Sequence, residues 1–247
     1  MQWVFHEAAS RGFGRYEWLT THYSFSFASY YDPNRMGFGL LRVLNDDVIA
    51  PGTGFGKHPH DNMEIITIPL SGAIRHEDSM GNSATISVGE VQVMSAGTGV
   101  FHAEYNASET EPLSLLQIWI ETNKRDVLPR YGQKRFIEED LRDELCPVVG
   151  PIGTTTLDIY QDATLSLGPF EQGRHIQYRL SDITHGLYFF VIEGSVIIEG
   201  KQLSSRDGLG VWDIPGGMLT FVTAPKTYLL LIEIPMTEKA SSATLEV

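Results

Sequence analysis

The stretch that decides the fold is GTGFGKHPHDNMEI, residues 52–65, in which His58 and His60 stand one residue apart. On an extended chain, side chains two positions apart emerge on one face, whereas on a helix they diverge by about 200°. Pro59 lies between the two histidines and is disfavoured inside a helix. We therefore expect a strand that turns both imidazoles toward one point.

A second stretch, MSAGTGVFHAEYN at residues 94–106, repeats this spacing with His102 and Glu104. Three neutral imidazoles and one carboxylate make a mixed nitrogen and oxygen ligand set for a divalent transition metal. A metal that takes more than four ligands keeps room there for water, substrate or dioxygen, and such an open position is what catalysis needs. The sequence thus predicts one metal site formed by His58, His60, His102 and Glu104.

Short β-branched and aromatic runs, separated by glycine and proline, predict an all-β chain. The turn-rich DSMGN, residues 78–82, predicts a hairpin. One segment, RFIEEDLRDELC at residues 135–146, is acidic outside with a rough apolar stripe and predicts a helix, so we expect domains at residues 1–134 and 135–247. The predicted strands lie at residues 39–44, 64–70, 84–88, 90–94 and 113–121, and then at 155–161, 163–168, 186–194, 195–200, 208–215, 218–224 and 228–235.

The two halves of the chain can be laid over one another, as expected for a duplicated unit. Placing Gly72 on Gly194 and Gly89 on Gly208 brings their apolar patterns into register. In that register, to within a residue or two, the four candidate ligands fall opposite Leu180, Asp182, Phe221 and Thr223. We therefore expect a C-terminal domain that has lost the metal ligands.

Composition narrows the class of function. The chain has 247 residues, 42% of them hydrophobic, which is enough for two domain cores. Its formal charge of -13 opposes direct contact with nucleic acid or an anionic membrane. A single cysteine excludes an internal disulfide, and no secretion signal or membrane-spanning run is evident, so the cytoplasm is the expected compartment.

Most other candidate residues have a structural explanation. Lone histidines are usually surface or satisfied core residues, which we expect of His6, His22, His175 and His185. His76, beside charged residues near the predicted hairpin, is expected to be exposed in a loop. Trp119, Trp212 and most phenylalanines are expected to fill the cores. GTGFGKH has no helix pattern after it, so it is a turn before a strand and no phosphate loop.

These stretches resemble the two cupin motifs: Gly52, His58, His60, Glu64 and Gly72 in the first, and Gly89, Gly97, His102 and Asn106 in the second. The spacing within these motifs departs from that of cupins in general and points to a subfamily. The chain is similar to the pirin family, and to its bacterial quercetin 2,3-dioxygenase-like members in particular. The stretches that carry this likeness are HPHDNMEIIT, DSMGN, MSAGTGVFHAEYN and the early YSFSFASYYDPNRMGF. The likeness covers most of residues 10–235. It implies a bicupin: two tandem jelly-roll β-barrels with a few short helices, the second degenerate.

The resemblance also bears on the ligand set. Cupins in general use the glutamate after the paired histidines, here Glu64, whereas pirins use the acid two residues after the last histidine, here Glu104. We favour Glu104 as the ligand and expect Glu64 to hydrogen-bond the other ring nitrogen of a ligating histidine, which would fix its tautomer. Iron(II) is the first choice of metal, while nickel, manganese, copper and zinc remain compatible with this set.

The function that the resemblance implies is a quercetin 2,3-dioxygenase, which cleaves a flavonol with dioxygen and releases carbon monoxide. Its partners would be a small aromatic substrate and dioxygen, and Glu104 would act as general base. The alternative is a regulator that binds a protein partner according to the oxidation state of its metal. A metal-dependent isomerase or another dioxygenase on the same scaffold is a third possibility, because a fold does not fix a reaction.

Overall fold

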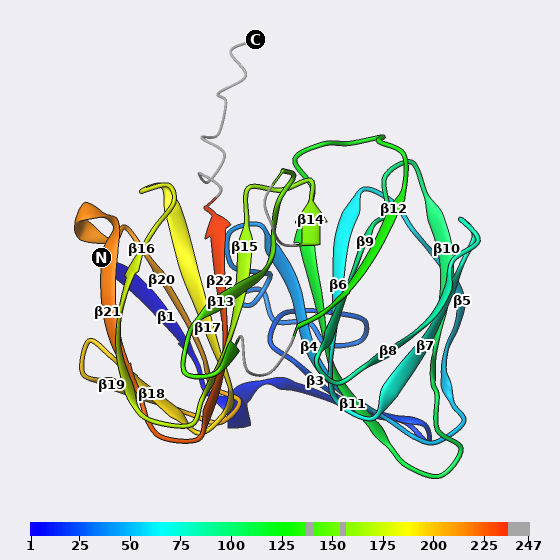
Figure 1. The fold of residues 1–247 in the computed structure, drawn as a ribbon, viewed down its shortest axis with the longest axis horizontal. Helices are drawn as coiled ribbons and strands as arrows, with labels where there is room; N and C mark the ends of the chain where they lie inside the picture. The colour runs from blue at the N-terminus through cyan, green and yellow to red at the C-terminus, as the bar shows by residue number, and fades with distance from the viewer. Residues whose placement is uncertain (137–140, 154–156, 237–247) are drawn as a thin grey trace.

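The structure is a computed structural model that describes residues 1–136, 141–153 and 157–236. Its first unit consists of a seven-stranded sheet, in the order β12-β9-β6-β11-β4-β3-β2, facing a four-stranded sheet in the order β5-β10-β7-β8 (Figure 1). The strand bounds are β2 Gly12–Arg15, β3 Leu19–Tyr23, β4 Leu41–Ile49, β5 Gly54–His60, β6 Met63–Ser71, β7 Ala73–Asp78, β8 Ser83–Ser87, β9 Glu90–Ser95, β10 Val100–Asn106, β11 Leu113–Glu121 and β12 Arg130–Arg135.

The second unit repeats this plan, with a seven-stranded sheet in the order β1-β20-β17-β22-β15-β13-β14 and a four-stranded sheet in the order β16-β21-β18-β19. Its strands are β1 Gln2–His6, β13 Cys146–Pro151, β14 Leu157–Ile159, β15 Thr164–Phe170, β16 Arg174–Arg179, β17 His185–Glu193, β18 Ser195–Ile198, β19 Lys201–Ser204, β20 Gly208–Trp212, β21 Met218–Thr223 and β22 Thr227–Pro235. The expectation of an all-β bicupin is confirmed.

Strand alternation gives each large sheet two apolar faces. In β11, Leu116 and Ile118 belong to a core cluster that also contains Phe190 and Ile232 of the second unit, so the two large sheets pack against each other. The alternate residues of β11 point the other way, and Leu115 packs inside the first unit. Because successive side chains on a strand face opposite sides, the run LSLLQIWIE serves both an interface and a barrel interior.

The N-terminal strand crosses between the units. β1 pairs antiparallel with β20, so residues 2–6 lie in the sheet of the second unit, while β12 pairs with β9 in the first. The large sheet of the second unit therefore has an edge strand, β1, that comes from the start of the chain, whereas the corresponding edge strand of the first unit, β12, follows β11 in the sequence. A division of the chain at residue 134 stays a prediction.

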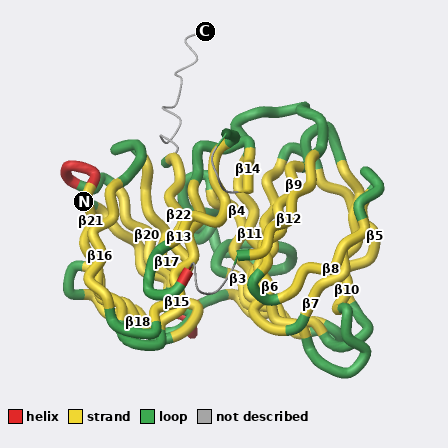
Figure 2. The backbone as a smooth tube through the Cα atoms, viewed as in Figure 1, coloured by secondary structure: helices red, strands yellow, loops and turns green. Residues whose placement is uncertain are grey.

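Helical structure contributes little to this fold, and Figure 2 shows strands joined by loops. The described residues include two 3₁₀ turns, η1 Ala8–Ser10 and η2 Pro215–Gly217. The helix expected at residues 135–146 falls in part on residues 137–140, outside the described residues; β12 ends at Arg135 and β13 begins at Cys146. No helix in the described part of the chain is long and apolar enough to cross a membrane.

Candidate metal centre and cavity

The two histidine stretches lie side by side in the small sheet of the first unit. β10 pairs antiparallel with β5, and His102 lies directly opposite His58. His60 is on the same face of β5, two residues on, as the spacing predicted. The three rings converge: their centroids are 4.4 Å apart for His58 and His102, and 4.8 Å apart for each of the other two pairs. One ring nitrogen from each lies within 4.8 Å of the others, close enough to hold one metal ion.

Hydrogen bonding and burial favour the neutral, metal-binding form of these imidazoles. The Nδ1–H of His58 donates to the Gly56 carbonyl at 2.8 Å, which leaves the Nε2 lone pair free to bind a metal. That Nε2 lies 3.0 Å from the Nε2 of His102. Burial, together with the neighbouring rings, lowers the pKa of His60 to about 4 and that of His102 to about 2. Neutral imidazoles are the form that coordinates a cation.

Glu104 lies two residues after His102 on the inward face of β10. The register of β10 against β5 shifts between these two residues. Its carboxylate is buried, accepts a hydrogen bond from Gln117 Nε2 at 2.7 Å, and lies 3.3 Å from the Thr67 hydroxyl. Burial raises its pKa to about 7. One of its oxygens lies within 4.8 Å of ligand nitrogens of His102 and His76. That all four predicted residues bind one ion stays a prediction.

The prediction for His76 is wrong. This histidine lies within β7, pairs with Glu104 of β10, and is completely buried. Its Nε2–H donates to Asp78 at 3.1 Å, and its ring centroid is 5.4 Å from that of His102. The charged neighbours Glu77 and Arg75 point outward, because alternate residues of a strand face opposite sides. His76 therefore lies beside the candidate ligands rather than in a loop.

The prediction that Glu64 hydrogen-bonds a ligating histidine is also wrong. Ile65 lines the cavity described below, so its neighbour Glu64 faces away from the histidines, on the side of β6 that carries Ile66 toward the second unit. There the Ser95 hydroxyl donates to its carboxylate at 2.5 Å. Glu64 is thus a buried acid between the two units and contacts none of the candidate ligands.

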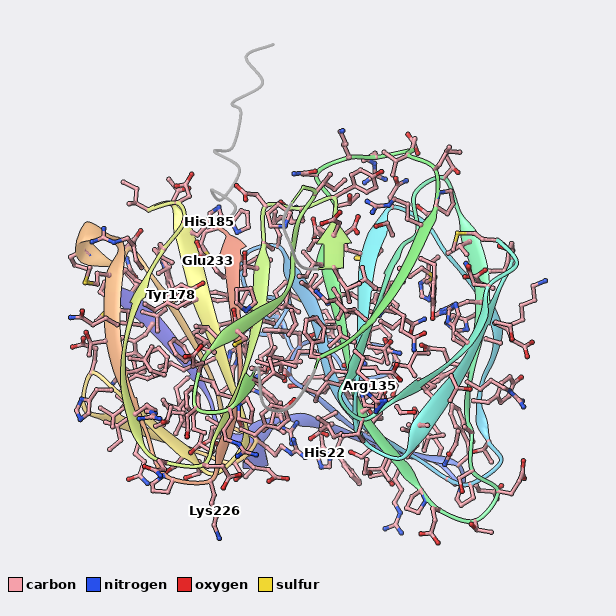
Figure 3. The ribbon with its side chains drawn as sticks, in the orientation of Figure 1. His22, Arg135, Tyr178, His185, Lys226 and Glu233 are labelled. Atoms are coloured by element: carbon pink, nitrogen blue, oxygen red, sulfur yellow. The ribbon has the colours of Figure 1, made fainter. Side chains whose placement is uncertain are left out.

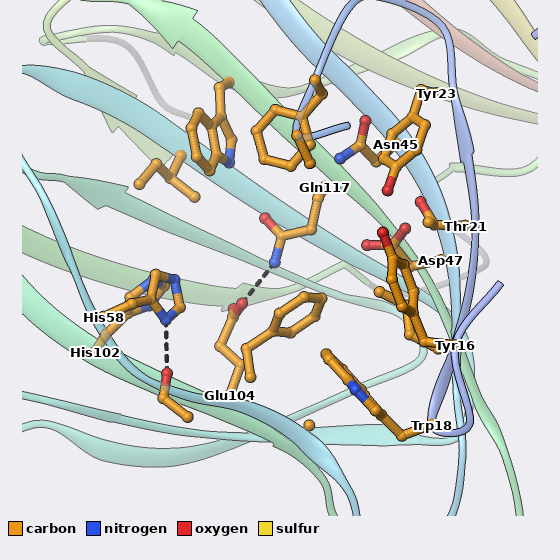
Figure 4. A pocket seen from close by; sticks show the side chains of 18 of the residues that line it. Tyr16, Trp18, Thr21, Tyr23, Asn45, Asp47, His58, His102, Glu104 and Gln117 are labelled. Carbon is orange, nitrogen blue, oxygen red and sulfur yellow. Dashed lines mark hydrogen bonds between the residues drawn. The ribbon is translucent and has the colours of Figure 1, made fainter. Parts of the chain in front are cut away.

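The histidines open onto a cavity of about 420 Å³ inside the first unit (Figure 4). Trp119, expected to fill a core, instead lines this cavity, half-buried, with its ring 4.8 Å from that of His60 in an edge-to-face contact. None of the described residues that line it is Lys or Arg. The lining residues are Tyr16, Trp18, Leu19, Thr21, Tyr23, Phe27, Ala28, Asn45, Asp47, Gly54, Phe55, Gly56, His58, His60, Ile65, His102, Glu104, Gln117 and Trp119.

Several of these residues were not predicted from the sequence. Asn45 and Asp47 belong to the run LRVLNDDVI, and Gln117 belongs to LSLLQIWIE. Polar residues at inward positions of otherwise apolar strands are a signal that could have identified them. Thr21, on the short strand β3, carries no such signal.

Three of the remaining histidines have the structural roles expected of them. His185 is a satisfied core residue: with Tyr178 it gathers around the buried Glu233 of the second unit, 3.1 Å from its carboxylate (Figure 3). His6 lies 2.9 Å from the Tyr188 hydroxyl in the core, and His175 is exposed.

Apart from Glu233 and its partners, apolar side chains fill the interior of the second unit. Fifteen buried residues form this cluster, among them Phe189, Phe221 and Leu231. Phe221 lies on β21, the counterpart of β10, and Leu180 follows β16, the counterpart of β5. Because these positions carry no ligating atoms, the counterpart of the histidine cluster is an apolar core.

Comparison with known proteins agrees with this architecture. Residues 5–120 match the family model described as Pirin, and residues 148–234 match that of the quercetinase C-terminal cupin domain. The chain is 42% identical over 207 residues to the quercetin 2,3-dioxygenase of Escherichia coli strain K12, a match that covers 84% of this chain and 88% of the relative.

Solved structures give the same picture. The crystal structure of YhhW from Escherichia coli superposes with a TM-score of 0.90 at 39% identity and covers 96% of this chain and 99% of that one. A second structure, bacterial pirin YhhW in complex with nickel(II), gives a TM-score of 0.89 at 38% identity, with coverage of 96% and 100%. Both halves of the chain, and their arrangement, are thus accounted for by one family. This chain belongs to the pirin family of two-domain cupin proteins.

Proposed function

We propose that this protein is a metal-dependent dioxygenase that opens the central ring of a flavonol such as quercetin. One observation carries the proposal: three converging imidazoles open onto a cavity of about 420 Å³ whose lining includes several aromatic side chains. That volume falls in the range of small-molecule sites, roughly 300–1,000 Å³. The relative named quercetin 2,3-dioxygenase supports the choice of substrate.

His58, His60, His102 and Glu104 are the proposed ligands, and iron(II) is the proposed metal. The donor set fits such an ion, because the Nε2 atoms of His58 and His102 lie 3.0 Å apart with the Nδ1–H of His58 already engaged. When bound, the ion would supply a positive charge that favours the deprotonated substrate, and an open position for chemistry with dioxygen.

The chain's own residues bind the substrate and move a proton. Trp18, Phe55 and Trp119 offer flat apolar surfaces against which a planar flavonol can lie. Glu104, beside the histidines and held by Gln117, would accept the proton of the 3-hydroxyl group. The flavonolate then takes up both atoms of dioxygen, the central ring opens, and one ring carbon leaves as carbon monoxide, so that all atoms are accounted for.

The test is turnover by anaerobically purified protein whose metal has been identified by elemental analysis. Oxygen consumption and carbon monoxide release in a one-to-one ratio, over many turnovers per metal, are expected. Glu104→Gln should lower the rate by about a hundredfold or more, the scale of a general base, and His102→Ala should lose both metal and activity. Metal-loaded protein that consumes no flavonol, or an unimpaired Glu104→Gln variant, would contradict the proposal.

The competing function, a regulator that senses the oxidation state of the metal, would use the same ligands. The size and aromatic lining of the cavity favour a small-molecule substrate, because a sensor of oxidation state needs no such space. Absence of turnover, combined with an affinity for a protein partner that follows the oxidation state, would support the regulator instead.

A further inference from the structure

The cavity has a second polar end, away from the histidines. Figure 4 shows Thr21, Asn45 and Asp47 gathered on one side of the cavity, with Gln117 and Glu104 between them and His58. The strand register explains this grouping, because Thr21 of β3 lies directly opposite Asp47 of β4, and Asn45 lies directly opposite Gln117 of β11. Three adjacent strands thus carry one row of polar side chains across an apolar wall.

The members of this second end are buried but incompletely hydrogen-bonded. Thr21, Asn45 and Asp47 are 1%, 4% and 2% exposed, respectively. By distance and angle, the Thr21 hydroxyl and the Oδ1 atoms of Asn45 and Asp47 have no hydrogen-bond partner within the described protein. The Thr21 hydroxyl is nevertheless close enough to Asp47 to act on the pKa of that carboxyl group as a weak donor, so the atom of the three without any such neighbour is Asn45 Oδ1. A buried polar atom left without a partner costs about 1–3 kcal/mol, so such atoms lining one cavity indicate a place where a ligand supplies the missing partners.

The chemistry of these atoms restricts the ligand. An amide oxygen and a carboxylate oxygen both accept hydrogen bonds, so the matching groups on the ligand must donate them. The described residues that line the cavity include no Lys or Arg, so no cationic side chain at this end would neutralise a carboxylate or phosphate group of a ligand. Tyr16 and Tyr23 stand beside the polar group and offer aromatic surface. A ring that carries hydroxyl groups meets all three conditions.

We propose that Thr21, Asn45 and Asp47 form a hydroxyl-recognition subsite that selects polyhydroxylated aromatic substrates by the ring remote from the reacting group. The inference rests on the proposed function for its placement of the reacting group at the histidines. It adds a determinant of specificity. A flavonol without hydroxyl groups on its outer rings would leave the hydrogen-bond acceptors of the subsite without partners and would bind more weakly.

The test compares quercetin, which carries hydroxyls on both outer rings, with 3-hydroxyflavone, which carries only the reacting hydroxyl. Affinities are measured by anaerobic calorimetry on metal-loaded full-length protein, and kcat/KM is measured separately in air. We expect the wild type to favour quercetin by about tenfold to a hundredfold, the scale of two or three buried hydrogen bonds at about 1 kcal/mol each. Galangin, hydroxylated on the fused ring only, identifies which ring enters the subsite.

Two variants of the subsite and one matched control complete the design. Thr21→Val and Asp47→Leu remove the polar atoms and keep the branching of each side chain, and each should bring the quercetin to 3-hydroxyflavone affinity ratio toward one. Thr223→Val, at an equally buried threonine of the second unit, should keep the wild-type ratio. Equal wild-type affinities, or ratios unaltered in both variants, would overturn the inference even if flavonols are consumed. Discrimination in binding without any turnover would support the subsite and overturn the proposed function.

Discussion

Asp47 gives the sharpest prediction about stability, because it is an acid held at the inner surface of a largely apolar unit. It is 2% exposed, and burial raises the pKa of its carboxyl group from 3.8 to about 7. The native protein therefore holds this proton more tightly than the unfolded chain does. Between these two pKa values the free energy of unfolding falls as the pH rises, and a shift of about three pH units corresponds to about 4 kcal/mol at 1.36 kcal/mol per unit.

Asp47→Asn should stabilise the protein, because the amide keeps the shape of the neutral acid and never ionises. The wild type loses this stability between pH 3.8 and about pH 7, and about half of that range lies above pH 5.5. The variant's gain in unfolding free energy should therefore be about 2 kcal/mol larger at about pH 8.5 than at about pH 5.5. The measurement is urea denaturation of chelator-treated wild type and variant at both pH values. Such a gain would mean that the ionisable acid is kept at a cost in stability, as is common in ligand-binding sites.

The neighbouring residue supplies a matched control. Asp46 lies next in the strand and forms ion pairs with Arg11 at 3.2 Å and Arg206 at 3.3 Å. Asp46→Asn leaves the buried Arg11 without its carboxylate, so we expect a loss of about 3–5 kcal/mol at both pH values. A gain from Asp47→Asn that is the same at both pH values, or a loss of stability in that variant, would refute the account of Asp47 as a buried, destabilising charge.

Three further predictions address the metal and the second unit. His76→Ala should weaken metal affinity by about tenfold to a hundredfold, because the buried ring packs beside His102; competition with a metal-binding dye measures this, and the exposed His175→Ala should have no effect. Phe221→Ala should lower the free energy of unfolding by about 3–5 kcal/mol through a cavity in the second core, while elemental analysis finds the metal content unaltered. Free metal at about a hundredfold its Kd should raise the unfolding free energy by about 2.7 kcal/mol, and His102→Ala should abolish that increase in a thermal scan; an equal increase in the variant would mean that the ion binds elsewhere.

The sequence by itself determined the all-β class, many of the strands and the convergence of the histidines, but it did not indicate β1, β3 or β16. The one-residue spacings at His58 and His60 and at His102 and Glu104 were sufficient, because a strand returns to the same face every second residue. The register of the two halves also placed Phe221, a residue of the second apolar core, near the position opposite His102. These are local or periodic properties, which a linear pattern can carry.

Only the tertiary structure decided what surrounds those residues. His76 and Glu64 were misjudged, since which face of a strand meets a partner depends on the packing of β7 and β6 against other sheets. β1 pairs with β20, and Thr21 of β3 pairs with Asp47 of β4. Both pairings join segments that are distant in the chain, and nothing in the local composition of those segments indicates them. The polar far end of the cavity exists because three strands are brought into one register, and register is set by the folded sheet as a whole.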